Sequence, residues 1–283
     1  KAYLYFGGGK ELFVAPLKDN MKEITAEPIK VEGLPAGYKE GSFCFKKDGK
    51  YYFTFAHVFA DEGYSIGYAT SDNPLGPFQY QGKIMDNINN GTNHHSVVNY
   101  NGRWILFYHF WQISGYNKLR SMCADYMEFK KDGTIKKVKP TMRGINSPTI
   151  GEEIQVDRHN GIKGANTSFV SGDEPLGWMV CDTKMMSTVQ FNSVDFADGS
   201  ATKMQARVAC GQRIGHFEVR IGNPKGKLIA KFPIKSTGGW SSWETIETPL
   251  LEKVTGKQNI VLVFHSDWGS TKAFNLNWLK LVK

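Results

Sequence analysis

The sequence lacks a long apolar run, a recognisable signal peptide and any C-x-x-C cysteine pair. It has no run of about 18 apolar residues, so no membrane span is expected. No signal peptide is recognisable at its start. None of its four cysteines belongs to a C-x-x-C pair, which argues against a zinc or redox motif. The cysteines could be thiols or two disulfides, and the sequence leaves both alternatives open.

Positive charge is in excess, but it is not concentrated. The net charge is +8 and the pI is about 9.1, with lysines scattered along the chain. A nucleic-acid-binding protein would gather such charge into one stripe on a recognisable module. We therefore expect no nucleic-acid partner. The hydrophobic fraction of 41% and the aromatic fraction of 13% indicate a globular protein.

An internal repeat of about 50 residues is present. The segments "KAYLYF", "GKYYFTFAH" and "GRWILFYHF" begin at Lys1, Gly49 and Gly102, and each alternates aromatic with aliphatic positions. The second and third copies follow a strand and a turn, "KDG" or "YNG", whose residues tolerate positive φ. Such a repeat of short strands predicts a β-propeller.

The predicted propeller is incomplete. The chain supplies about two and a half blades, whereas closure takes about four to eight. The first copy begins at Lys1 without the strand and turn that precede the other copies. We expect closure to require either a missing N-terminal segment or self-association with a second chain.

The character of the sequence changes near residue 140. A segment rich in Pro, Gly, Ser and Thr predicts a linker over residues 145–153, after a propeller part over residues 1–144. Residues 154–283 hold short alternating segments separated by Gly, Asn and Pro. This pattern predicts a β-sandwich of the jelly-roll type, so the whole chain is expected to be all-β.

Glu40 is the first candidate for chemistry. It lies in "GYKEGSFCF", at the start of a strand that would line the propeller channel. Enclosure by Tyr38 and Phe43 would raise the pKa of its carboxyl group, which suits a general acid. The alternative is an ordinary exposed glutamate at a strand start.

His94, His95 and Arg120 are further candidates in the same half. His94 and His95 occupy the equivalent place in the next copy, and strand alternation sends them to opposite sides. The histidine that faces the channel could bind a metal, hydrogen-bond a substrate or fill a polar cavity. Arg120 begins a further strand and could be a channel cation. Packing histidines and a surface arginine are the alternatives.

Tryptophans mark the second half. Sugar rings stack on exposed aromatic faces, and polar groups then hold the hydroxyls. Trp240 in "STGGWSSWET" and Trp268 in "HSDWGS" are predicted to lie in loops. Trp278 in "NLNWLKL" is predicted to be a core residue. Trp178 is a further candidate.

Taken together, the segments resemble known families. "KAYLYFGGGKELFVAPLKDNM", "KEGSFCFKKDGKYYFTFAH" and "TNHHSVVNYNGRWILFYH" are similar to glycoside hydrolase family 43, the five-bladed propeller glycosidases. The details look most like arabinoxylan arabinofuranohydrolases and related xylosidases. "SVDFADG", "ARVACG" and "AFNLNWLKL" resemble a family 6 carbohydrate-binding module.

The resemblance implies inverting hydrolysis of arabinofuranosyl or xylosyl linkages in arabinoxylan or xylan. Such a site holds a general-base Asp, a second Asp and a general-acid Glu, with acid and base roughly 6.5–9.5 Å apart. Glu40 matches the acid, and Arg120 matches a substrate-binding arginine. His94, followed by Ser96, matches the "H-x-S" histidine that is associated with a central calcium or another metal ion.

The two family aspartates have no counterpart. Asp19, Asp48 and Asp72 are expected in turns or loops. We therefore expect this chain alone to be inactive unless it is completed. The alternative is a non-catalytic carbohydrate-binding protein with a remnant propeller.

The module half also departs from its family. Thr188 stands where one aromatic platform is usual, while Trp240 and Asn275 match the family pattern. Trp178 or Trp268 could replace the lost platform. The resemblance further implies calcium in the module, plant cell-wall polysaccharide as partner, and a secreted or periplasmic location.

Overall fold

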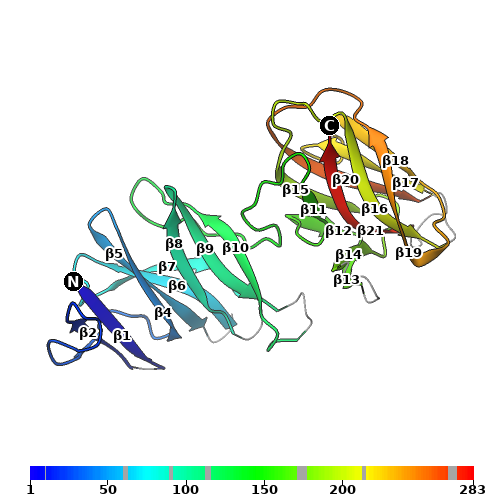
Figure 1. The fold of residues 1–283 in the computed structure, drawn as a ribbon. Coiled ribbons are helices and arrows are strands. Elements are labelled where there is room, and N and C mark those ends of the chain that lie inside the picture. Colours follow the sequence, from blue (N-terminus) through cyan, green and yellow to red (C-terminus); the bar gives the residue numbers. More distant parts are fainter. Residues whose placement is uncertain are drawn as a thin grey trace. The chain divides into compact units, whose positions relative to one another are not determined.

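The computed structural model describes residues 1–9, 11–59, 63–88, 92–111, 116–170, 177–211, 215–266 and 273–283. All regular elements in these ranges are β-strands, as the sequence predicts (Figure 1). The chain divides into two compact units, Lys1–Pro140 and Thr141–Lys283. Within the described ranges, no helix has the length and hydropathy needed to cross a membrane.

The first unit contains three antiparallel sheets, which hold three, four and three strands. Its strands are β1 (Ala2–Gly8), β2 (Glu11–Leu17), β3 (Ile29–Lys30), β4 (Tyr38–Lys47), β5 (Lys50–Phe59), β6 (Gly63–Ser71), β7 (Gln79–Met85), β8 (His95–Tyr100), β9 (Arg103–Phe110) and β10 (Ser121–Met127). The first strands of the sheets are neighbours, because β1 contacts β4 and β4 contacts β8. Among the described strands this is an open row of blades, as expected for an incomplete propeller.

The predicted hairpin turns are confirmed. Asp48 and Gly49 have φ values of 50° and 84°, and Asn101 and Gly102 have values of 50° and 77°. Positive φ at both central residues is the mark of a type I′ turn, which matches the twist of the flanking strands. The turns therefore explain the pairing of β4 with β5 and of β8 with β9 near each turn.

The middle sheet packs on both of its faces. Tyr52 belongs to a cluster with Leu106 of the third sheet, and the next residue, Phe53, belongs to a cluster with Val14 of the first sheet. Successive strand residues point to opposite faces, so β5 supplies both clusters. Each fully buried aromatic contributes about 1.5–3 kcal/mol. This two-sided burial holds the three sheets together.

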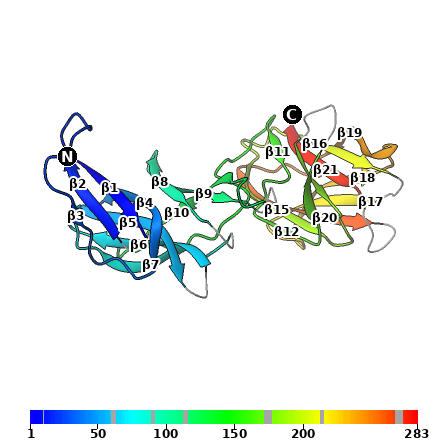
Figure 2. The same ribbon diagram turned by 90° about the horizontal axis from the view of Figure 1, so that it is seen from below.

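The second unit is a sandwich of two sheets (Figures 1 and 2). One sheet has the order β13-β14-β21-β16-β19 with β11 on β21, and the other has the order β12-β15-β20-β17-β18. The bounds are β11 (Glu153–Gln155), β12 (Gly161–Lys163), β13 (Asn166–Phe169), β14 (Trp178–Cys181), β15 (Thr188–Asp195), β16 (Lys203–Cys210), β17 (Gly215–Ile221), β18 (Leu228–Ile234), β19 (Gly239–Pro249), β20 (Lys257–Ser266) and β21 (Asn275–Val282). Both sheets contribute to one core, which includes Phe217 and Leu279. The predicted sandwich is confirmed. The cysteines are thiols rather than disulfides.

Candidate functional site

Glu40 lies in β4 beside an irregular stretch of the strand. The pairing of β4 with β5 shifts register on both sides of Glu40, and Gly41 has a φ of +66°. A β-bulge of this kind redirects the side chains next to it. The Glu40 side chain is 43% exposed. It is therefore open to solvent at the start of the strand, where a substrate could reach it.

The predicted aromatic enclosure of Glu40 is wrong. Tyr38 is buried in one hydrophobic cluster, and Phe43 packs against the other. The Tyr38 hydroxyl is hydrogen-bonded to Ser42 at 2.9 Å. The register shifts turn Tyr38 and Phe43 into the two interfaces between sheets and leave Glu40 outside them.

The three predicted propeller residues do come together. His94 Nε2 lies 3.5 Å from Glu40 Oε1. His94 and Arg120 line one surface hollow, together with His109 and Met122. Glu40 comes from β4, whereas His94 and Arg120 directly precede β8 and β10. Three separate strand starts thus supply an acid, an imidazole and a cation to one place.

His95 is a packing residue. Its Nε2 is hydrogen-bonded to Thr54 Oγ1 of the neighbouring sheet at 2.6 Å. Burial, and secondarily His94, lower the pKa of His95 to about 3. The two adjacent histidines therefore point in different directions, as strand alternation predicts, and His94 is the one beside Glu40.

The buried His95 should make stability depend on pH. A histidine in an unfolded chain has a pKa of about 6.5. Between this pH and about pH 3, His95 is therefore protonated in the unfolded state and neutral in the folded state. The free energy of unfolding should then fall as pH is lowered through this window. Urea unfolding at pH 7 and pH 5 should show a smaller fall for His95→Gln than for the unmodified chain. An equal fall in both would contradict this role. Some pH dependence should persist, because burial also lowers the pKa of His57 to about 4.

His109 and Tyr64 belong to the site and were not predicted. The backbone N–H of His94 donates to His109 Nδ1 at 3.3 Å, and His109 Nε2 donates to the Thr92 carbonyl at 2.8 Å. Burial first, and then Arg120 and His94, lower the pKa of His109. A signal was available, because the two-residue "NG" turn pairs Tyr100 with Arg103 and so places His109 opposite His94.

Tyr64 approaches Glu40 from β6. Burial and the neighbouring Glu40 carboxylate raise the pKa of Tyr64. Its hydroxyl therefore stays protonated and can donate to the carboxylate. No local pattern indicated this contact, because it depends on how β6 lies against β5 and β4.

The residues around His94 do not suit calcium. Calcium takes about 6–8 oxygen ligands. Among the described residues, the hollow is lined by imidazoles, the Arg120 guanidinium and the hydroxyl residues Ser96 and Tyr108, and the Glu40 carboxylate lies beside His94. A cationic side chain and nitrogen donors disfavour a hard cation. The implied channel calcium stays a prediction, and no step below uses it.

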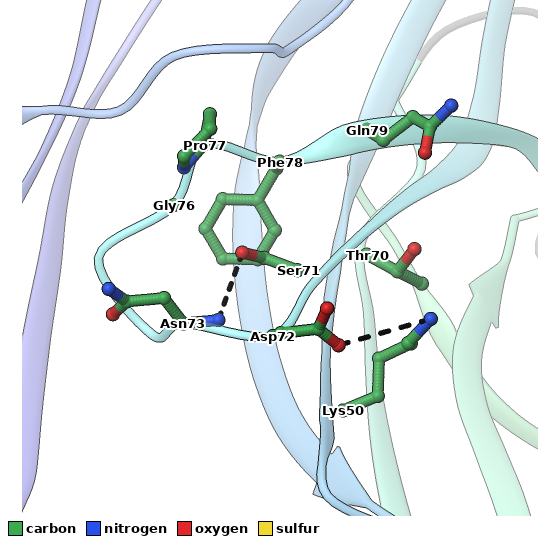
Figure 3. A pocket seen from close by; sticks show the side chains of 9 residues that line it. All are labelled: Lys50, Thr70, Ser71, Asp72, Asn73, Gly76, Pro77, Phe78 and Gln79. Carbon is green, nitrogen blue, oxygen red and sulfur yellow. Dashed lines mark hydrogen bonds and ion pairs between the residues drawn. The ribbon is translucent and has the colours of Figure 1, made fainter.

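A second hollow lies at the turn between β6 and β7 (Figure 3). Lys50 and Asp72 form an ion pair at 4.0 Å on its rim, and Asn73 donates its backbone N–H to Ser71 Oγ at 3.1 Å. None of the predicted site residues lines it. The Asn73–Ser71 hydrogen bond stabilises the turn.

In the second unit, two asparagines hold two tryptophans. Asn275 Nδ2 donates to the main-chain carbonyl of Trp240 at 2.8 Å, and Asn277 Nδ2 donates to that of Trp178 at 2.7 Å. Asn275 and Asn277 are each 1% exposed. Both tryptophans are half-buried strand-end residues, so the prediction that Trp240 lies in a loop is wrong. The start of β21 thus connects Trp178, Trp240 and Asn275, and it adds Asn277, which the sequence did not single out.

Aromatic surface is present near Trp178. Phe169 is 60% exposed and packs edge-on against Trp178, with ring centroids 5.7 Å apart. Trp240 packs closely against Gly211, where a Cβ atom would lie 2.6 Å from the indole nitrogen. Phe169 is therefore an additional candidate for stacking on a sugar.

The other tryptophan predictions have different outcomes. Trp268 lies outside the described residues. The prediction that Trp278 is a core residue is wrong, because Trp278 is only partly buried and carries the Lys280 ammonium 5.0 Å above its ring. Leu279 and Leu281 of the same strand enter the core instead. The implied module calcium stays a prediction.

Comparison with known proteins identifies both units. Residues 1–135 match Glycosyl hydrolases family 43, and residues 156–283 match the Carbohydrate binding module (family 6). An arabinoxylan arabinofuranohydrolase of Paenibacillus polymyxa is 31% identical over 308 residues, which cover 97% of this chain and 48% of that protein. A beta-xylosidase of Xylanibacter ruminicola is 36% identical over 134 residues, which cover 47% of this chain and 41% of that protein.

A solved structure agrees with these relatives. The crystal structure of a glycoside hydrolase family 43 arabinoxylan arabinofuranohydrolase from Bacillus subtilis, in complex with cellotetraose, matches with a TM-score of 0.59 and 25% identity. The match covers 99% of this chain and 64% of that one. The chain spans about half the length of the curated relatives it matches. The chain therefore belongs to glycoside hydrolase family 43 in its first unit, and a family 6 carbohydrate-binding module follows in its second.

Proposed function

We propose that this chain supplies the acid side of an inverting glycosidase site for arabinoxylan or xylan, together with a module that holds the polysaccharide. The observation that carries the proposal is the approach of Glu40 to His94 at 3.5 Å, beside a hollow that His94 and Arg120 line. The relatives named as an arabinoxylan arabinofuranohydrolase and a beta-xylosidase support this substrate class. The partner would be plant cell-wall polysaccharide, met outside the cytoplasm.

Each residue has a distinct role in this proposal. Glu40 donates a proton to the glycosidic oxygen as the bond breaks. His94 and Tyr64 orient its carboxyl group, and Arg120 binds substrate hydroxyls through its planar donors. Inversion also needs a base roughly 6.5–9.5 Å from the acid. We assign no residue of this chain to that base, so the 283-residue chain should hydrolyse little by itself.

Completion of the site is a separate proposal. An N-terminal segment would supply the base and further blades. A second copy of the chain would supply further blades alone, because no residue of this chain is assigned to the base. Size-exclusion chromatography and an activity assay together distinguish these routes, since self-association gives a dimer without the base and an N-terminally extended chain gives an active monomer. If the chain and its N-terminally extended version are both folded, inactive monomers, the second candidate function is favoured, a non-catalytic carbohydrate-binding protein.

Replacing Trp240 with alanine tests the module. Sugar stacking on one aromatic face contributes on the order of 1 kcal/mol, so binding to arabinoxylan should weaken about fivefold. Isothermal titration calorimetry with soluble arabinoxylan measures this change. Trp278→Ala is the matched control, because Trp278 lies under Lys280 and is not assigned to the site. If Trp240→Ala binds as the unmodified chain does, the sugar site lies elsewhere.

A further inference from the structure

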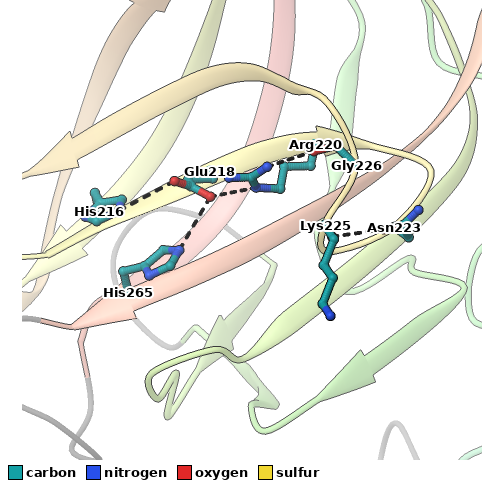
Figure 4. A network of polar contacts seen from close by, with 7 residues as sticks. All are labelled: His216, Glu218, Arg220, Asn223, Lys225, Gly226 and His265. Carbon is teal, nitrogen blue, oxygen red and sulfur yellow. Dashed lines mark hydrogen bonds and ion pairs between the residues drawn. The ribbon is translucent and has the colours of Figure 1, made fainter.

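The sandwich carries a cluster of two histidines and a glutamate on its second sheet (Figure 4). His216 and Glu218 lie two residues apart on β17, so strand alternation places both on one face. Register places His265 of β20 directly opposite His216. The residue between the two on β17, Phe217, enters the core, so the cluster lies on the outer face of the sheet.

We propose that His216, Glu218 and His265 form a binding site for a borderline divalent cation of the Zn²⁺ class. Their candidate ligand atoms all lie within 4.8 Å of one another. In the described residues this is the one group of three or more His, Cys, Asp or Glu side chains arranged in this way. Two imidazoles and one carboxylate are a donor set that zinc adopts with a fourth position left open.

The distances fit a shared ion better than a hydrogen-bonded network. His265 Nε2 lies 3.5 Å from Glu218 Oε2, and His216 Nε2 lies 4.0 Å from Glu218 Oε1. Hydrogen bonds between such atoms are about 2.7–3.2 Å long. A tetrahedral ion bonded at about 2.0–2.2 Å holds neighbouring donor atoms roughly 3.3–3.5 Å apart. The Glu218–His265 pair already has this spacing, and His216 would have to move closer to the carboxylate to join it.

The histidine rings are arranged for joint binding. They stack with centroids 4.4 Å apart and planes 10° from parallel, and the Nε2 atom of each lies within 4.0 Å of the Glu218 carboxylate. His265 Nε2 is buried and has no hydrogen-bond partner in the described part of the chain. Its contact with Glu218 Oε2 at 3.5 Å is longer than a hydrogen bond, and a cation would give this nitrogen a direct bond.

Arg220 orients the carboxylate. Its Nε donates to Glu218 Oε2 at 2.7 Å, and its Nη1 donates to the Gly226 carbonyl at 2.7 Å. Burial alone would raise the pKa of Glu218, but Arg220 and the two histidines hold it below its ordinary value. Glu218 is therefore a carboxylate at neutral pH, and Oε1 is directed toward His216. The guanidinium charge will weaken cation binding, while its hydrogen bond keeps the ligand in place.

The imidazole nitrogens determine which class of metal ion the site prefers. Zinc and its first-row neighbours bind imidazole, whereas calcium and magnesium prefer oxygen ligands. The site is therefore distinct in chemistry from a calcium site. The side chains of His216, His265 and Glu218 are 24%, 21% and 13% exposed, so the cluster lies at the edge of the solvent rather than in the core.

Zinc titration of the chelator-treated full chain tests the site. Calorimetry should show one zinc ion whose affinity falls at least tenfold in His216→Ala and in His265→Ala. Cobalt should give the visible absorption of a four-coordinate ion in the unmodified chain and lose it in both variants. Millimolar calcium should not compete. Glu247→Gln, an exposed carboxylate of the same module, is the matched control and should bind zinc normally.

Folding of the variants is checked separately. Thermal unfolding without metal should be similar in all variants, and zinc should raise the melting temperature of the unmodified chain and the control alone. If either alanine variant fails to fold, Glu218→Gln and His265→Gln replace it, because both keep the volume of the side chain. Equal zinc stoichiometry and affinity in the folded variants and the unmodified chain would overturn the proposal.

Discussion

Replacing Glu40 with glutamine should lower arabinoxylan hydrolysis by roughly 10²–10⁴-fold in an N-terminally extended, active version of this chain. The amide keeps the size of the side chain and its place beside His94, but it cannot donate a carboxylic proton. The sugar leaving group of the polysaccharide needs that proton, because an alkoxide leaves poorly. The rate of reducing-sugar release measures the loss.

The dependence on the leaving group makes this prediction specific. p-Nitrophenol leaves readily without protonation, so Glu40→Gln should retain much more activity on p-nitrophenyl arabinofuranoside or xyloside than on arabinoxylan. Glu128→Gln is a matched control, since Glu128 is exposed and paired with Lys136 at 2.7 Å. Equal losses on both substrates would show that Glu40 is not the proton donor. Full activity of Glu40→Gln on arabinoxylan would remove it from the site.

Replacing Phe217 with alanine should destabilise the module by about 3–5 kcal/mol. Phe217 is 0% exposed and stacks on Phe232 with centroids 4.5 Å apart. Phe264 and Phe274 pack against the same ring at 5.9 Å and 5.8 Å. Removing it leaves a cavity between the two sheets, where neighbouring rings cannot collapse without losing their own contacts.

Calorimetric unfolding measures this loss. The two units should unfold in separate transitions, and only the transition of the module should shift to lower temperature. Phe169→Ala is the control, because Phe169 is 60% exposed and outside the core. A shift as small as that of the control would mean that the packing around Phe217 does not hold the sandwich together.

Local chemistry explains which parts of the fold were predictable. The "KDG" and "YNG" turns require positive φ, and that requirement sets the pairing of the flanking strands near each turn. The same turn register places His109 opposite His94, so this neighbour was predictable as well. Alternation correctly separates His94 from His95, because successive strand residues point to opposite faces.

Irregular backbone explains the wrong predictions. The register shifts around Glu40 accompany the placement of Tyr38 and Phe43 in two separate hydrophobic clusters. Gly41, an isolated glycine inside the strand with a φ of +66°, was the available signal for this bulge. A second irregularity, where β16 pairs with β21, accompanies the outward position of Trp278. A bulge adds one residue to a strand, so every alternation argument that crosses it reverses.

The sequence by itself determined the strand-rich repeat, the turns of its hairpins and the families that the two units resemble. Those features depend on residues close together in the chain. Only the tertiary structure decided that Glu40, His94 and Arg120 share one place, and that His265 stands opposite His216. These contacts join residues that are distant in the sequence, so they depend on how the sheets pack and how distant strands pair. Burial over the whole unit determines that pairing, and local residue preferences do not.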